Sequence, residues 1–116
     1  MNKRGVNEIK RNLLEALKKE KAFWSFEESL INETTISDEF LIAYTLRYLD
    51  LKEIDSLYKI YSAKKIKQAW KTLLVPEGEY LYTLNRFLAW YYFDAKKPDA
   101  YLKSLYTRHL NKLLLI

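Results

Sequence analysis

The stretch LNRFLAWYYFDAKKPDAYLKSLYTRHL, residues 84–110, decides the fold class of this chain. Apolar residues recur in it at spacings of three and four, which is the period of an α-helix. Its first part belongs to a segment, residues 79–93, that is apolar on nearly every side, as in a central helix packed by several neighbours. We therefore expect a central fifth helix whose largely buried side chains are Leu84, Leu88, Trp90 and Tyr91. Pro98 then opens a last helix, with Asp99 in its first turn.

The same period runs through the rest of the sequence. Only two glycines and two prolines interrupt 116 residues. This predicts an all-α protein, a compact bundle of five to six helices with no sheet. We find no domain linker, so a single helical domain is expected over residues 1–116. Within it, residues 1–22 form a lysine-rich helix that can project from the bundle.

Polar residues mark the predicted helix starts. The second helix is expected to begin at Ser37 or Asp38, and the fourth after Ser62, because these side chains cap helix N-termini. Asp50 and Glu53 have the spacing of a capping box at the start of the third helix. The side chains expected to face the core or to anchor connections are Val6, Ile9, Leu13, Leu17, Phe23, Trp24, Phe26, Phe40, Leu41, Tyr44, Tyr48, Ile54, Leu57, Tyr58, Tyr61, Ile66, Ala69, Trp70, Leu73, Tyr101, Leu102, Leu105 and Leu110.

Charge and composition limit the class of protein. The formal net charge is +5, and basic residues gather in residues 1–22, 63–76 and 96–116 with acidic ground between them. This pattern differs from the continuous basic footprint of many nucleic-acid-binding proteins. Cysteine is absent, which excludes disulfides and thiolate chemistry. No apolar run reaches the ~18 residues of a membrane span. We expect a cytoplasmic protein that does not enter a membrane.

The residues that carry catalysis in other proteins are sparse. His109 is the sole histidine, and no metal-ligand partner lies three or four residues from it. Glu27 and Glu28 are an acidic pair in a connection, where such pairs are usually solvated. No glycine-rich phosphate loop and no nucleophile motif is present. We expect no enzyme activity, no metal and no cofactor.

One segment, residues 53–73, has the pattern of a helix-turn-helix. Its second helix would turn a basic face outward, and the candidate nucleic-acid contacts are Lys64, Lys65, Lys67, Gln68 and Lys71. A solvated helix face explains the same lysines, since lysine is a good helix former. DNA binding through phosphates is therefore an alternative hypothesis.

The aromatic residues, 16% of the chain, allow three interpretations. They can fill the core, stack on single-stranded nucleic acid, or bind a protein partner. The candidate partner-binding residues are Tyr82, Arg86, Tyr101 and Tyr106. Lys96, Lys97 and Lys103 would form a basic rim around them, which favours an acidic protein partner, and a weak homodimer is also expected.

The segments FWSF, ISDEFLIAYTLRYLDLKEIDSLYKIYSAKKIKQAWKTL and LNRFLAWYY resemble a family of small bacterial all-helical domains of unknown function. The resemblance covers residues 23–93, and Leu49 and Ser62 stand where the family pattern has glycine. Members of that family lie beside nucleotidyltransferase toxins of the abortive-infection class, so the resemblance implies an antitoxin-like role. The predicted function is a non-catalytic protein-binding accessory module. The matching positions are Phe23, Trp24, Tyr48, Asp50, Tyr61, Ile66, Asn85 and Phe87.

Overall fold

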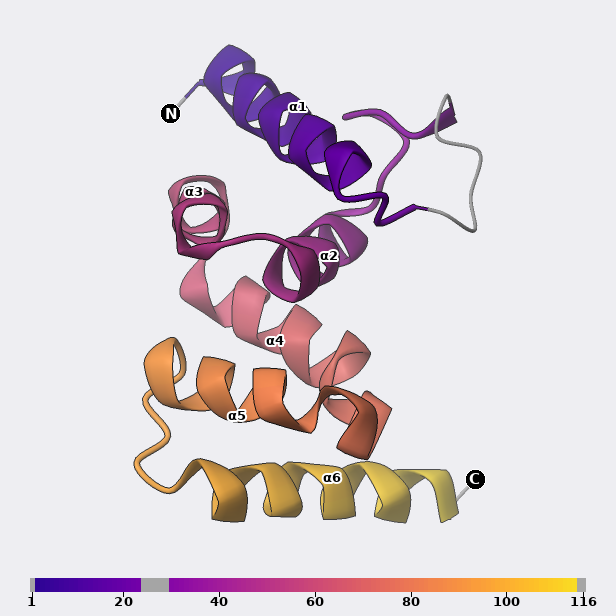
Figure 1. The fold of residues 1–116 in the computed structure, drawn as a ribbon, viewed down its shortest axis with the longest axis vertical. Helices are drawn as coiled ribbons and strands as arrows, with labels where there is room; N and C mark the ends of the chain where they lie inside the picture. Colours follow the sequence, from indigo (N-terminus) through magenta and orange to yellow (C-terminus); the bar gives the residue numbers. More distant parts are fainter. Residues whose placement is uncertain (1, 24–29, 115–116) are drawn as a thin grey trace. The chain divides into compact units, whose positions relative to one another are not determined.

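A computed structural model describes residues 2–23 and 30–114 of the chain (Figure 1). No strand occurs within these ranges, so the predicted all-α class with five to six helices and no sheet is confirmed. The elements in chain order are α1 (Lys3–Lys19), α2 (Asp38–Tyr48), α3 (Leu51–Ile60), α4 (Ala63–Leu73), the 3₁₀ helix η2 (Val75–Leu81), α5 (Tyr82–Tyr91) and α6 (Pro98–Leu114).

Internal contacts divide the chain into two compact units, residues 1–69 and residues 70–116. The division falls inside α4, between Ala69 and Trp70. Each unit buries apolar side chains of its own. The prediction of a single domain over residues 1–116 stays a prediction.

In the first unit, α1, α2 and α3 each pack against the other two. The inner side of α1 buries Leu13, Leu14 and Leu17, as its apolar stripe predicts. Within this unit α1 thus packs on α2 and α3. Burial of these leucines stabilises the fold, because each Å² of apolar surface removed from water contributes about 25 cal/mol.

The helix starts of the first unit follow the polar residues. The Ser37 hydroxyl accepts a hydrogen bond from the Phe40 backbone N–H at 3.2 Å, and Ser62 caps α4 through the Lys65 N–H at 3.1 Å. These two predicted caps are confirmed. Asp50 does precede α3, but its side chain makes no capping hydrogen bond, so the capping-box prediction is wrong in that detail. There the backbone carbonyl of Asp50 starts the helix by accepting from the Ile54 N–H at 3.0 Å.

The side of α2 that is buried differs from the predicted side by about one residue position around the helix axis. Phe40 is half exposed to solvent, although we expected it inside. The sequence is ambiguous here because two adjacent stripes of α2 are both apolar, and only packing chooses between them. Phe23 is buried with its ring edge against Tyr44 at 5.2 Å, while Trp24 and Phe26 lie outside the described residues. The side chains that α2 buries are Leu41, Ile42, Ala43, Thr45 and Leu46.

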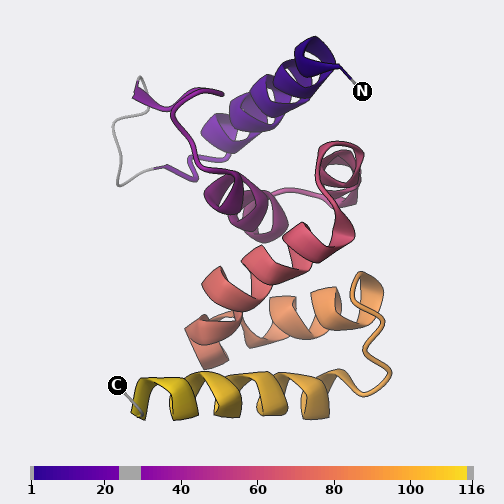
Figure 2. The same cartoon turned by 180° about the vertical axis from the view of Figure 1, so that it is seen from behind.

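In the second unit, α5 and α6 pack against each other and η2 packs against both. Figures 1 and 2 show α5 and α6 side by side and running in opposite directions. Residues 79–81 belong to the 3₁₀ helix η2, so α5 begins at Tyr82 rather than at Glu79, and Gly78 kinks η2. Its φ is +59°, a backbone conformation that a side chain would strain.

The core of the second unit contains a buried polar pair. Trp70 is fully buried, and its indole N–H donates to the Asn85 side-chain oxygen at 3.0 Å. The Asn85 side-chain nitrogen donates in turn to the Leu74 carbonyl at 3.0 Å. Asn85 is only 2% exposed, so both halves of its amide are satisfied inside the protein. The Trp70 ring also packs on Phe93, with centroids 4.5 Å apart.

The prediction of a fifth helix buried on all sides is wrong. Leu88 is fully buried as expected, but Trp90 is 59% exposed and Tyr91 is 49% exposed. Within the second unit, α5 packs against α6, η2 and Trp70, and these contacts leave Trp90 and Tyr91 largely in solvent. In α6, Leu102 and Leu105 are buried as predicted, whereas Leu110 is exposed.

The two tryptophans should therefore differ in their effect on stability. Trp70→Ala should lower the free energy of unfolding by about 3–5 kcal/mol, because it empties core volume and strands the Asn85 amide. Trp90→Ala should lower it by less than about 1 kcal/mol, because its ring is mostly in solvent. Urea unfolding of the two variants beside the parent chain measures both effects, and equal losses would contradict the assignment of Trp70 to the core.

Candidate protein-binding site

A groove opens on the second unit where η2, α5 and α6 meet, and we name it the Tyr82–Tyr106 groove. Its volume is about 680 Å³. Val75, Asn85 and Leu102 are buried and form its floor, while the two tyrosines are partly exposed. The floor is apolar except for the Asn85 amide. The residues that line the groove are Val75, Gly78, Glu79, Tyr82, Asn85, Asp99, Leu102, Lys103 and Tyr106.

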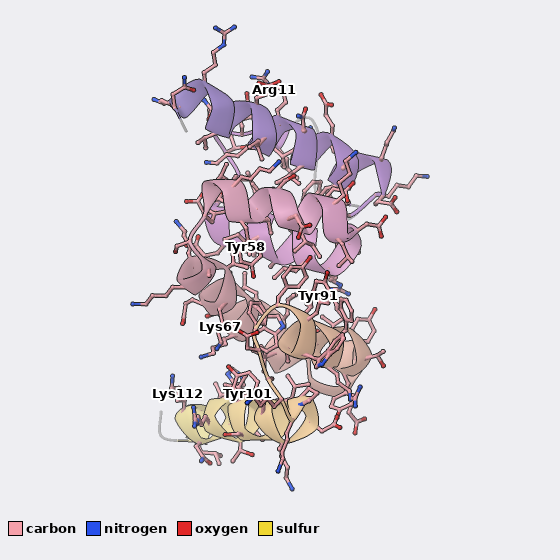
Figure 3. The ribbon with its side chains drawn as sticks, turned by 90° about the vertical axis from the view of Figure 1, so that its left-hand side faces the viewer. Arg11, Tyr58, Lys67, Tyr91, Tyr101 and Lys112 are labelled. Atoms are coloured by element: carbon pink, nitrogen blue, oxygen red, sulfur yellow. The ribbon has the colours of Figure 1, made fainter. Side chains whose placement is uncertain are left out.

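The structure brings together three of the four predicted partner-binding residues. Tyr82 and Tyr106 line the groove from α5 and α6. Arg86 does not line it but contacts Asp99, which does, through its Nε at 3.0 Å. Tyr101 lies elsewhere: Figure 3 shows it on the side of α6 that faces α5, and its ring stacks on Trp70 at 6.3 Å. Tyr101 therefore serves the core.

Asp99 links the two walls of the groove. Its carboxylate accepts hydrogen bonds from the Tyr82 hydroxyl and from Arg86. The hydrogen bond from Tyr82 is the main reason that the pKa of Asp99 is lowered, and Arg86 lowers it further. The same hydrogen bond raises the pKa of Tyr82. At neutral pH the groove thus holds an ionised carboxylate and a protonated tyrosine at one edge.

At Gly78 the backbone of η2 passes close to Tyr106, the second tyrosine of the groove. A Cβ added there would lie 3.6 Å from the Tyr106 ring, so the backbone of η2 comes close to that side chain. Glu79 and Lys103, both exposed, complete the lining with one charge of each sign. This arrangement can hold an apolar side chain between two tyrosines and can pair with charges beside it.

A second surface consists of three exposed rings on α5, which we name the α5 aromatic face: Phe87, Trp90 and Tyr91. The rings of Phe87 and Tyr91 stack with centroids 5.3 Å apart and an angle of 17° between their planes. Trp90 lies 6.4 Å from Phe87 and 6.1 Å from Tyr91. We expected two of these side chains inside. Two polar residues on the same side of α5, Thr83 and Arg86, are also exposed. They are the sequence feature that indicates an outward side.

The predicted nucleic-acid contacts of α4 differ in how far they are exposed. Lys64 and Gln68 are exposed, and Lys67 is half-buried. Lys65 is exposed but pairs with Asp38 at 2.9 Å, and its ammonium lies 5.4 Å from the centre of the Tyr61 ring. Lys71 belongs to the second unit. DNA binding through this helix stays a prediction.

Asp38, the first residue of α2, is the partner of Lys65 and binds two further side chains. It accepts a hydrogen bond from the Tyr61 hydroxyl at 2.7 Å and also pairs with Lys10 of α1 at 3.4 Å. Partial burial would raise the pKa of Asp38, but the hydrogen bonds from Tyr61 and Lys65 and the nearby lysine charges lower it from 3.8 to about 2. Burial and the bond to Asp38 raise the pKa of Tyr61. The cluster joins α1, α2 and the first turn of α4, all within residues 1–69.

The remaining candidate groups are His109, Glu27 and Glu28. His109 is half-buried on α6, and Glu27 and Glu28 lie outside the described residues. Within residues 2–23 and 30–114, no three His, Cys, Asp or Glu side chains gather in a way that could hold a metal ion. In the same ranges, no helix has the length and apolar character needed to cross a membrane.

Comparison of this chain with family models, curated proteins and solved structures gives no match.

The Asp38 cluster should make stability depend on acid pH. Because the folded pKa of Asp38 lies below 3.8, its contribution is present above about pH 4 and is lost as pH falls toward 2. Asp38→Asn should lower the free energy of unfolding at pH 7 by about 1 kcal/mol, a value reduced because the carboxylate is partly exposed. The difference in the free energy of unfolding between the parent and Asp38→Asn should be smaller at pH 3 than at pH 7.

The matched control is Glu39→Gln, which removes a charge from the same first turn but leaves the hydrogen bonds to Asp38. Urea unfolding at pH 7 and at pH 3 gives the comparison for all three proteins. A gap for Asp38→Asn that is the same at both pH values, or no larger than that of Glu39→Gln, would rule out a stabilising role for the cluster.

Proposed function

We propose that this chain is a non-catalytic protein-binding module, and that the Tyr82–Tyr106 groove holds an acidic amphipathic helix of a partner protein. The observation that carries the proposal is the groove itself: two partly exposed tyrosines stand across an apolar floor. Tyrosine is enriched at protein interfaces because it combines a large ring with a hydroxyl. The mixed charges at the edges suit a polar rim around an apolar anchor.

Exposed leucines extend this surface along α6. Tyr106, Leu110 and Leu113 are spaced by four and three residues, so they share one side of the helix, and Leu114 lies beside them. The distance from Tyr106 to Leu114 along the helix axis is about 12 Å. Such an apolar strip, continuous with a groove, is the surface on which the apolar side of another helix packs.

Charge favours an acidic partner. Residues 70–116 contain seven basic and four acidic side chains, and no acidic residue follows Asp99. Lys103 lies in the groove, and Lys96 and Lys97 are exposed just before α6. Opposite charges across an interface speed association and select the partner. A second copy of the chain would bring the same basic strip against itself, so this surface suits a different protein.

The resemblance to small helical domains beside nucleotidyltransferase toxins supports an antitoxin-like version of this proposal. In that version the partner is the product of a neighbouring gene. If that gene encodes a nucleotidyltransferase, its acidic helices are the first segments to test against the groove.

The test is selection from a display library of random 16-residue peptides on the intact chain. We expect enriched peptides to be acidic, with leucine or aromatic residues at helical spacing. Their affinity should fall at least about tenfold for Tyr106→Ala, because an anchor ring is lost. It should fall about fivefold or more for Lys103→Glu, because a favourable charge becomes repulsive.

Arg108→Glu is the matched control, since it reverses a charge on the same helix but on a side that does not line the groove. It should change affinity by less than about twofold. If no peptide is enriched, or if the enriched peptides bind Tyr106→Ala and Lys103→Glu as well as the parent, the groove is not the binding site.

A further inference from the structure

The two tyrosines of the Tyr82–Tyr106 groove differ in what their hydroxyl groups bind. The Tyr82 hydroxyl donates to the Asp99 carboxylate, and Arg86 donates to the same carboxylate oxygen. The Tyr106 hydroxyl makes no hydrogen bond within residues 2–23 and 30–114. A ligand in the groove therefore meets one hydroxyl that is already committed and one that is still able to donate.

Packing against η2 fixes the place of the Tyr106 hydroxyl. A Cβ placed on Gly78 would lie 3.6 Å from the hydroxyl oxygen and 3.6 Å from one ring carbon of Tyr106. The hydroxyl end of the ring thus lies over the Gly78 backbone, at the η2 wall of the groove. A hydroxyl that is already held in place loses little conformational freedom when it binds a ligand.

Lys103 stands beside this hydroxyl. It precedes Tyr106 by three residues on α6, so their Cβ atoms are about 5–6 Å apart. Both side chains line the groove. Within the part of the chain that the structure describes, the Lys103 ammonium forms no ion pair. The groove therefore has two uncommitted donors next to each other, and one of them is positively charged.

We propose that Lys103 and Tyr106 together bind one side-chain carboxylate, from an aspartate or glutamate of the partner helix. A carboxylate has two oxygens and accepts several hydrogen bonds, so it takes one from the ammonium and one from the hydroxyl. Hydrogen bonds to an ionised acceptor are about twice as strong as neutral ones. The proposal rests on the protein-binding function proposed above and names the group that the groove selects.

Glu79 limits how strongly this pair attracts a carboxylate. It follows Gly78 in η2 and lines the same groove, so its charge repels an incoming acidic group. Glu79→Gln should therefore strengthen the binding of an acidic peptide by about twofold, a small factor because the site is open to solvent.

Double-mutant cycles between the intact chain and acidic peptides test the proposal. The probes are the acidic peptides enriched in the selection described above, made with amidated C-termini so that only side chains carry carboxylates. Each aspartate or glutamate is replaced in turn by its amide, and isothermal titration calorimetry gives the affinity for the parent, Lys103→Gln and Tyr106→Phe.

One acidic position of the peptide should couple to both residues. With the unchanged peptide, Lys103→Gln and Tyr106→Phe should each lower affinity about fivefold or more, because a charge-assisted hydrogen bond is lost. With the peptide that carries an amide at that one position, each variant should lower affinity by less than about twofold, because the bond is already missing.

Tyr82→Phe and Arg108→Gln are the matched controls. Tyr82→Phe removes the hydroxyl that is committed to Asp99, so any loss of affinity should be the same for every peptide. Arg108→Gln removes a positive charge from α6 at a position that does not line the groove. It should change affinity by less than about twofold for each peptide.

Three results would overturn the carboxylate site and leave the groove as the binding site. They are the absence of any acidic position that couples to Lys103 and Tyr106, coupling of the two residues to different positions, and equal coupling for Tyr82→Phe and Tyr106→Phe. Failure to enrich any acidic peptide would instead overturn the proposed function, and this inference with it.

Discussion

The hydrogen bond from the Trp70 indole to the buried Asn85 amide sets the arrangement of residues 70–116. Asn85 uses its oxygen for Trp70 and its nitrogen for the Leu74 carbonyl, so both ends of the amide are committed. Rotation of α5 about its axis would leave three polar groups buried without partners, and each such group costs about 1–3 kcal/mol. The orientation of α5 therefore follows from this one residue.

That orientation decides which surfaces the second unit offers. With Asn85 and Leu88 turned inward, Tyr82 comes beside α6 and contacts Asp99, while Phe87 and Trp90 turn to solvent. The same orientation of α5 therefore both forms the groove and exposes the α5 aromatic face. The groove lies on a helix pair with an excess of basic residues, which is the basis for assigning it an acidic partner.

Local features of the sequence were enough to predict the helices. Ser37, Ser62 and Pro98 act on the turns that they begin, so their effect needs no knowledge of the rest of the fold. The choice between Trp70 and Trp90 for the core was not accessible in this way. Both lie on helices rich in apolar residues, and the deciding group is Asn85, whose partners are remote along the chain.

The candidate site was predictable only in part for the same reason. Tyr82 and Tyr106 are 24 residues apart in sequence, and their meeting depends on the register of the antiparallel pair α5 and α6. From the sequence, Tyr101 and Tyr106 are equally good candidates, but Tyr101 lies on the side of α6 that packs on Trp70. Lys65 looked free in sequence because its partner Asp38 belongs to a preceding helix.

Asn85 holds Trp70 inside the protein, while Trp90 stands in solvent. Amide and indole hydrogen exchange followed by NMR on the intact chain tests it most directly. We expect the Trp70 indole proton to exchange slowly, through opening of the core, and the Trp90 indole proton to exchange at the rate of an exposed side chain. Equally fast exchange at both indoles, or protection of Trp90 in place of Trp70, would rule out the packing on which the Tyr82–Tyr106 groove depends.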